Sequence, residues 1–97
     1  MAIIYKYKVE PKHDVQTIEV VYGARLISAI EQNGEIMVYA LTEHDYHKSL
    51  GIQSKNIFVV GTGWDFDLGN EFQKNLIGTV KVGTFVWHVL EVDELPF

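Results

Sequence analysis

The chain has 97 residues, 47% of them hydrophobic and 22% charged, and it carries a formal net charge of −5. This composition favours a folded chain over a disordered one, so we expect residues 1–97 to form a single domain. Basic residues number 8 against 13 acidic ones. Duplex nucleic acid is therefore a poor partner, because phosphate contacts need clustered cations. Cysteine is absent, which excludes disulfides, thiolate metal sites and cysteine nucleophiles.

Residues 2–9 predict a half-buried strand. Apolar and aromatic residues alternate there with lysines: Ile3, Tyr5, Tyr7 and Val9 on one face, Lys6 and Lys8 on the other. Because lysines interrupt every apolar run, we expect neither a signal peptide nor a membrane span. Pro11 ends this strand, and Val15–Tyr22 predicts a second one.

Asn33-Gly34 predicts a hairpin at the centre of the fold. Asn-Gly supplies the two positive-φ residues of a type I′ turn, and the flanking runs are apolar. A two-residue turn sets the register, which we expect to be Gln32 with Glu35, Ile30 with Met37, Ser28 with Tyr39 and Leu26 with Leu41. Both faces of this ribbon are largely apolar, so we place its two strands centrally, with other elements packed over each face.

The remaining elements are shorter. We expect strands at Asn56–Val60, Leu76–Val82 and Thr84–Val92, a helical turn within Glu43–Leu50 and a loop at Trp64–Asn75. About seven antiparallel strands separated by turns predict an all-β fold, a small sandwich or a partly open barrel.

Several short motifs are spread along the chain. They are IYKY at Ile4–Tyr7, Gly23-Ala24, Gly61-Thr62-Gly63, Gly78-Thr79 and Phe85–His88. Together they resemble a family of small proteins of unknown function encoded by bacteriophages and prophages. The resemblance implies a viral context and no particular reaction. The chain departs from the family pattern by a longer segment between Gly63 and Leu76 and by an acidic tail.

The segment after Gly63 carries the candidate partner-binding residues Trp64, Asp65, Phe66 and Asp67. Large apolar side chains on a loop must fold back onto the domain or be covered by a partner, and folding back is the commoner outcome. The oxygens of Asp65, Asp67, Asn70 and Glu71 could hold a hard cation. Their spacing does not follow the EF-hand pattern, which favours a solvated acidic loop.

A second candidate site is the glycine turn Gly61-Thr62-Gly63, with Tyr39 as an aromatic wall. Such a turn can offer backbone N–H groups to an anion, but no Lys or Arg accompanies it. Turn geometry is the commoner reason for these glycines. An aromatic platform for ligand stacking is a further alternative, made of Tyr5, Tyr7, Tyr22, Tyr39 and Trp87.

The histidines do not predict an active site. His44 and His47 are spaced like two zinc ligands on a helical turn, but no third ligand is evident, so a polar surface segment is favoured. His88 stands in an apolar strand, where we expect a core histidine bonded to backbone or to an acid. No nucleophile with a spaced base is present, and we expect no catalytic residue, no metal and no cofactor.

These observations lead to a functional expectation. The protein is expected to be a non-enzymatic phage accessory protein of the host cytoplasm that binds a macromolecule, foremost a host protein, without contacting a membrane. A viral protein or a second copy of the chain is an alternative partner. Two other functions stay open: sequestering a small, nucleotide-like molecule, and serving as a minor structural component of the virion.

Overall fold

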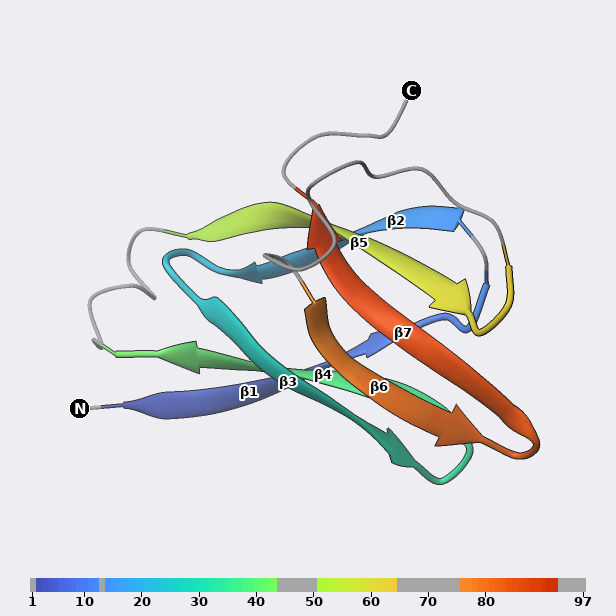
Figure 1. Cartoon of the computed structure of the whole chain (residues 1–97). Coiled ribbons are helices and arrows are strands. Elements are labelled where there is room, and N and C mark those ends of the chain that lie inside the picture. Colours follow the sequence, from blue (N-terminus) through green and yellow to red (C-terminus); the bar gives the residue numbers. More distant parts are fainter. Residues whose placement is uncertain (1, 13, 44–50, 65–75, 93–97) are drawn as a thin grey trace.

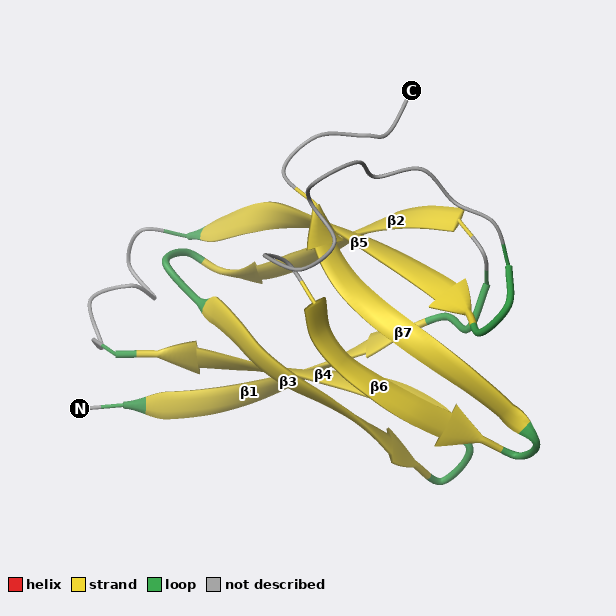
Figure 2. Cartoon of the chain, viewed as in Figure 1, coloured by secondary structure: helices red, strands yellow, loops and turns green. Residues whose placement is uncertain are grey.

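A computed structural model (Figure 1) describes residues 2–12, 14–43, 51–64 and 76–92. These residues form strands joined by turns and contain no helix (Figure 2). The strands are β1 (Ile3–Val9), β2 (Asp14–Val21), β3 (Arg25–Gln32), β4 (Glu35–Thr42), β5 (Ile52–Gly61), β6 (Leu76–Val82) and β7 (Phe85–Val92).

The strands build two antiparallel sheets. One has the order β1-β4-β3, and the other has the order β2-β5-β7-β6. The sheets stack as a sandwich and do not close into a barrel (Figure 1). The prediction of an all-β antiparallel fold of seven strands is confirmed, and of its two architectures the sandwich is the one that forms.

Alternation along β1 and β4 gives their sheet one buried face. Along β4, Ile36, Val38 and Ala40 are fully buried, whereas the residues between them are half-exposed. In β1, Val9 is buried and the two lysines are exposed, as the sequence predicts. Successive side chains of a strand point to opposite faces, so the period-two pattern aims one set of apolar side chains at the second sheet.

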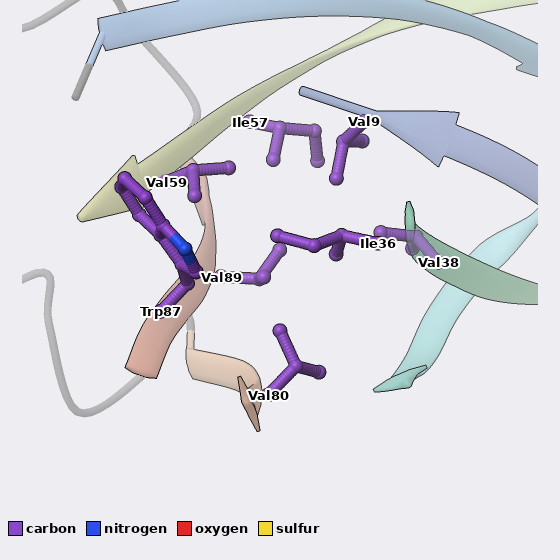
Figure 3. Close-up of a cluster of buried hydrophobic side chains, with 8 residues drawn as sticks. All are labelled: Val9, Ile36, Val38, Ile57, Val59, Val80, Trp87 and Val89. Atoms are coloured by element: carbon purple, nitrogen blue, oxygen red, sulfur yellow. The ribbon is translucent and has the colours of Figure 1, made fainter. Parts of the chain in front are cut away.

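The core lies between the two sheets (Figure 3). Its buried side chains come from five strands: Val9, Ile36, Val38, Ile57, Val59, Val80, Trp87 and Val89. Burying one such aliphatic side chain stabilises a fold by about 1.5–3 kcal/mol. Since each sheet supplies only part of this cluster, neither could bury its apolar face alone.

The turn between β3 and β4 consists of Asn33 and Gly34, whose φ angles are 54° and 82°. Pairing follows the expected register for Gln32 with Glu35, Ile30 with Met37 and Ser28 with Tyr39. The expected pair Leu26–Leu41 is wrong. A bulge between Leu26 and Ser28 shifts the register, and Leu26 pairs with Ala40 instead.

The two strands of this ribbon do not share a central position. β4 lies between β1 and β3, whereas β3 is an edge strand of the three-stranded sheet. Its exposed isoleucines, Ile27 at 41% and Ile30 at 39%, show that none of the described strands covers the outer face there. The prediction of elements over both faces is therefore wrong for β3, because apolar composition alone does not reveal whether a second layer exists.

β3 and β6, the edge strands on one side of the sandwich, lie close together, side by side (Figure 1). A Cβ atom placed on Gly78 of β6 would lie 3.2 Å from the backbone nitrogen of Ala29 and 3.3 Å from its Cβ. Backbone atoms cannot move aside as a flexible side chain can. The absence of a side chain at Gly78 therefore permits this contact between the sheets.

Side-chain groups close the opposite side of the sandwich, where β1 and β2 are the edge strands. The backbone N–H of Val21 donates to the Tyr7 hydroxyl at 3.2 Å. The Gln16 amide bonds both the N–H and the C=O of Glu10, at 2.8 Å and 3.0 Å. These bonds satisfy backbone groups that no neighbouring strand reaches.

β5 is longer than predicted, since it begins at Ile52 and not at Asn56. Its polar first half pairs with the edge strand β2, with Gln53 opposite Val20. Lys55 there forms a half-buried ion pair of 3.1 Å with Glu91 of β7. The sequence pattern does not predict this half as a strand because its residues are polar. Backbone hydrogen bonds, and not side-chain burial, hold it in the sheet. The prediction of a helical turn in Glu43–Leu50 falls on residues 44–50, outside the described residues.

We predict that Gly78→Val lowers the free energy of unfolding by about 1–3 kcal/mol, the usual cost of overpacking. The added side chain would collide with the Ala29 backbone. Urea unfolding with a two-state fit measures the change. Gly83→Asn is the control, because Gly83 has φ 62° and no atom within 4 Å of an added Cβ, and Asn tolerates this conformation. Equal losses at both positions would contradict the close-contact argument.

Candidate binding site

The most distinctive surface lies at one end of the four-stranded sheet, where β5 ends and the β6–β7 hairpin turns. Gly61, the last residue of β5, pairs with Trp87. The backbone N–H of Thr62 still donates to the Val86 carbonyl at 3.0 Å, and the N–H of Trp64 donates to the Gly61 carbonyl at 3.2 Å. This turn, with Gly63 at φ 87°, carries Trp64 back over the end of β5.

Three aromatic rings meet there, from Trp64, Phe85 and Trp87, which we call the aromatic cluster. The rings of Trp64 and Trp87 are 5.4 Å apart and nearly perpendicular, at 81°. Those of Phe85 and Trp87 are 6.5 Å apart and tilted by 44°. Edge-to-face pairs of this kind are favourable because the edge of one ring meets the electron-rich face of another.

The cluster has a buried base and an exposed rim. Trp87 is only 8% exposed and belongs to the core (Figure 3), whereas Trp64 is 48% and Phe85 63% exposed. Phe85 and Trp87 are two residues apart on β7 and so point to the same side of the strand. Phe85 is the first residue of β7 and pairs with Val82 beside the turn, so it extends past the core.

The absence of a side chain at Gly61 allows the indole ring of Trp64 to pack against the end of β5. A Cβ atom at Gly61 would lie 3.3 Å from Cδ2 and 3.4 Å from Cε2 of Trp64, and 3.6 Å from Cζ3 of Trp87. A side chain at Gly61 would therefore crowd the indole ring of Trp64, which would have to shift by a few tenths of an ångström. Turn geometry explains only some of the glycines in Gly61-Thr62-Gly63. At Gly61 a glycine is needed because the ring of Trp64 packs closely against the backbone.

The cluster borders an open pocket of about 280 Å³, close to the lower size limit of small-molecule sites. Its lining residues are uncharged: Gly61, Thr62, Trp64, Thr84, Phe85, Val86 and Trp87. The pocket therefore offers ring surfaces and threonine hydroxyls, and none of the residues that line it is a cation that would neutralise a phosphate.

His88 is not a core residue, contrary to the sequence prediction. It is half-buried and sits between two threonines, with Nε2 2.8 Å from the Thr62 hydroxyl and Nδ1 3.1 Å from the Thr79 hydroxyl. The Thr62 hydroxyl also donates to the Val86 carbonyl at 3.4 Å. Since Trp87 and Val89 point into the core, His88 between them points to the outer face of the sheet.

The Thr62–His88 pair has the spacing of a nucleophile and its base. In a catalytic triad, however, a carboxylate bonds the second ring nitrogen and stabilises the imidazolium. Here both ring nitrogens face threonine hydroxyls, so the second position is filled by a neutral group. The arrangement works as a polar bridge across β5, β7 and β6.

The structure brings together only part of the residues that the sequence suggested. Trp64, Gly61 and Thr62 line the pocket, and Gly63 lies in the same turn. Tyr39 does not join them, because it lies on the outer face of the three-stranded sheet between Lys6 and Ser28. Asp65, Phe66 and Asp67 lie outside the described residues, as do His44, His47, Asn70 and Glu71.

Sequence reasoning did not select Phe85, the most exposed ring of the cluster, as a site residue. The available signal was its position directly after the Gly83-Thr84 turn and in phase with Trp87. A strand residue next to a turn can extend beyond the layer that covers the rest of its face.

The face that carries Tyr39 is polar at its turn end. Lys8 lies 2.7 Å from Glu35 and 3.7 Å from Glu10. The hydrogen bond to Glu35, helped by the charge of Glu10, raises the pKa of Lys8 above its ordinary value. This stabilising effect is present below the ordinary pKa of lysine and is lost only as the pH rises through the raised value.

Two further properties concern the described residues alone. No group of three His, Cys, Asp or Glu side chains is placed among them so that it could hold a metal ion. They also include no helix of the length and apolarity that crossing a membrane requires.

A comparison with protein families shows to which family the chain belongs. Residues 1–96 match the family described as "Domain of unknown function (DUF7352)". The chain belongs to this family. No curated protein and no solved structure matches it. Membership in DUF7352 agrees with the resemblance to a family of unknown function, and the match does not link the chain to bacteriophages.

We predict that Thr62→Val shifts the Nε2 resonance of His88 in ¹H–¹⁵N spectra and lowers the unfolding free energy by about 0.5–1.5 kcal/mol. The substitution keeps the branched shape but removes the hydroxyl that bonds Nε2. Thr17→Val is the matched control, because the Thr17 hydroxyl bonds Asn56 at 3.0 Å on the same sheet. An unchanged Nε2 resonance in Thr62→Val would show that the bridge does not hold the ring.

Proposed function

We propose that this DUF7352 protein is a non-enzymatic binding protein and that the aromatic cluster is its contact surface. The observation that carries the proposal is the pair of exposed rings, Trp64 and Phe85, held against the buried ring of Trp87. Because Trp87 is part of the core, the rings rest on a rigid base. Little conformational entropy is then lost when a partner covers them.

Physical principles favour this surface over others on the described chain. Aromatic residues supply most of the binding free energy in many interfaces, since they bury large areas with few rotatable bonds. Other exposed apolar residues, such as Ile4 and Ile52, carry aliphatic side chains that have no ring. Single exposed aliphatic side chains are normal on a soluble protein.

The partner that we propose is a host protein, met in the host cytoplasm by a bacteriophage accessory protein. The viral context rests only on the motif resemblance, and the macromolecular nature of the partner rests on the open, ring-lined surface. A second copy of the chain and a role as a minor virion component are the alternatives that the experiment below distinguishes.

We predict that a photo-crosslinking phenylalanine analogue at position 85 gives a discrete covalent adduct in host cells that produce the protein. Phe85 is 63% exposed, so the protein that carries the analogue should fold normally. The analogue should then contact any partner that covers the aromatic cluster. Mass spectrometry of the adduct distinguishes a host protein, a second copy and a virion protein. Replacing Trp64 by Ala in the same chain should reduce the yield several-fold, because the neighbouring ring is lost.

The same analogue at Ile4 is the matched control, since Ile4 is 58% exposed but lies on the outer face of the other sheet. Adducts of equal identity and yield from positions 85 and 4 would show non-specific contact. No adduct at position 85 in a chain with a normal unfolding midpoint would overturn the proposed function.

The pocket of about 280 Å³ beside Gly61, Thr62 and Trp64 supports a second candidate function, the sequestering of a small molecule. Its uncharged lining suits a planar ring that stacks on the indoles better than it suits a phosphate group. In this reading Tyr39 takes no part, because it lies on the other sheet.

The second candidate predicts a retained ligand. Native mass spectrometry of the protein purified without denaturation should then show an added mass that disappears on unfolding, and the free ligand should raise the melting temperature by mass action. Gly61→Ala should weaken retention, because an added Cβ displaces the Trp64 ring. A clean chain mass, with no melting shift in a panel of nucleosides and nucleotides, would reject this function.

A further inference from the structure

We propose that Asn33 is a site of spontaneous deamidation and that the carboxylate of Glu31 protects it in the folded protein. Asn33-Gly34 is the only Asn-Gly dipeptide of the chain, and it forms the turn between β3 and β4 (Figure 1). None of the residues that line the pocket beside the aromatic cluster lies in this turn. The proposal therefore does not depend on the proposed binding function.

Deamidation at Asn-Gly is a reaction of the chain with itself. The backbone nitrogen of Gly34 gives its proton to hydroxide, and its electron pair forms a bond to the side-chain carbonyl carbon of Asn33. The bond from that carbon to the side-chain nitrogen breaks, and the amino group takes a proton from water and leaves as ammonia, which regenerates hydroxide. Water then opens the cyclic imide to aspartate or isoaspartate. Glycine favours the attack because it has no Cβ beside the nitrogen.

The reaction depends on the Gly34 N–H, and the structure gives this group a partner. Backbone pairing of β3 with β4 ends with Gln32 opposite Glu35, so Gly34 lies outside the ladder. Its N–H instead donates to Oε2 of Glu31 at 2.5 Å. A hydrogen bond to an ionised acceptor is roughly twice as strong as one between neutral groups.

This hydrogen bond opposes the first step of deamidation in two ways. Loss of the Gly34 proton would leave an amide anion beside the carboxylate of Glu31, and a nearby like charge disfavours the ionised form. In addition, the cyclic imide replaces the N–H bond of Gly34 by a bond to Asn33. The hydrogen bond to Glu31 must therefore break before the ring can close.

Protection of Asn33 preserves the turn that sets the register of β3 and β4. The two turn residues have φ angles of 54° and 82°, the left-handed conformations that a two-residue hairpin turn requires. Isoaspartate routes the backbone through the former side chain and adds one carbon atom to it. The lengthened turn no longer fits the pairing of Gln32 with Glu35.

Incubation of the wild-type chain, Glu31→Ala and Glu35→Ala in mildly alkaline buffer tests the proposal. Peptide mapping by mass spectrometry measures the conversion of Asn33 with time. We expect Glu31→Ala to deamidate at least about threefold faster than the wild type, which is less than the full loss of a charged hydrogen bond would give because the turn is exposed to water. Glu35→Ala is the matched control. It removes the same charge beside the turn, but the Glu35 carboxylate pairs with Lys8 at 2.7 Å, so its rate should equal that of the wild type.

Two further measurements separate the hydrogen bond from other effects of the substitution. Glu31→Gln keeps the length of the side chain and an acceptor oxygen but lacks the charge, so it should fold like the wild type and deamidate at an intermediate rate. In concentrated urea the wild type and Glu31→Ala should deamidate at nearly equal rates, because the folded turn and its hydrogen bond are absent.

Three outcomes would overturn the proposal. Equal rates in the folded wild type and folded Glu31→Ala would show that the carboxylate does not protect Asn33. Equal acceleration by Glu31→Ala and Glu35→Ala would show a general effect of charge and not of the bond to Gly34. A rate ratio between wild type and Glu31→Ala that is the same in urea as in the folded state would assign the effect to the local sequence and not to the turn.

Discussion

The burial of Trp87 between the two sheets is the interaction on which both the fold and the candidate site depend. Its indole joins the core cluster with side chains from both sheets, and the same ring supports Trp64 and Phe85 at the surface. The exposed rings are thus attached to a buried side chain of the core. A binding surface that is held in place before it meets a partner loses less entropy on association.

Two glycines set the close contacts that make this arrangement possible. Gly78 lets β6 approach the backbone of Ala29, which closes one side of the sandwich, and Gly61 lets the Trp64 ring lie on β5. Both act through the missing Cβ and not through an unusual φ, since neither has a positive value. Asn33 and Gly34, in contrast, act through their φ angles, because their left-handed conformations form the β3–β4 turn.

The polar groups of the sheet ends show how a small sandwich protects its backbone. Tyr7 and Gln16 satisfy backbone groups of Val21 and Glu10 on the side of the sandwich where β1 and β2 are the edge strands. The Thr62–His88–Thr79 bridge joins β6, β7 and the residue directly after β5 on the outer face. These bonds use uncharged partners, for which desolvation costs less than for ions. The chain thereby holds its strands together with only one half-buried ion pair, Lys55–Glu91, among the described salt bridges.

The sequence by itself determined the strands, the buried face of β1 and β4 and the register next to Asn33-Gly34, because alternation and turn chemistry are local properties. Only the tertiary structure decided the bulge that moves Leu26, the edge position of β3, the outward direction of His88 and the meeting of Trp64, Phe85 and Trp87. The sequence identified Trp64 and the glycine turn as two separate candidates, and it combined the glycine turn with Tyr39, which lies on the other sheet. The physical reason is that stacking of two sheets and pairing across β5, β6 and β7 join residues far apart in the chain, and no local pattern encodes which strand lies beside which.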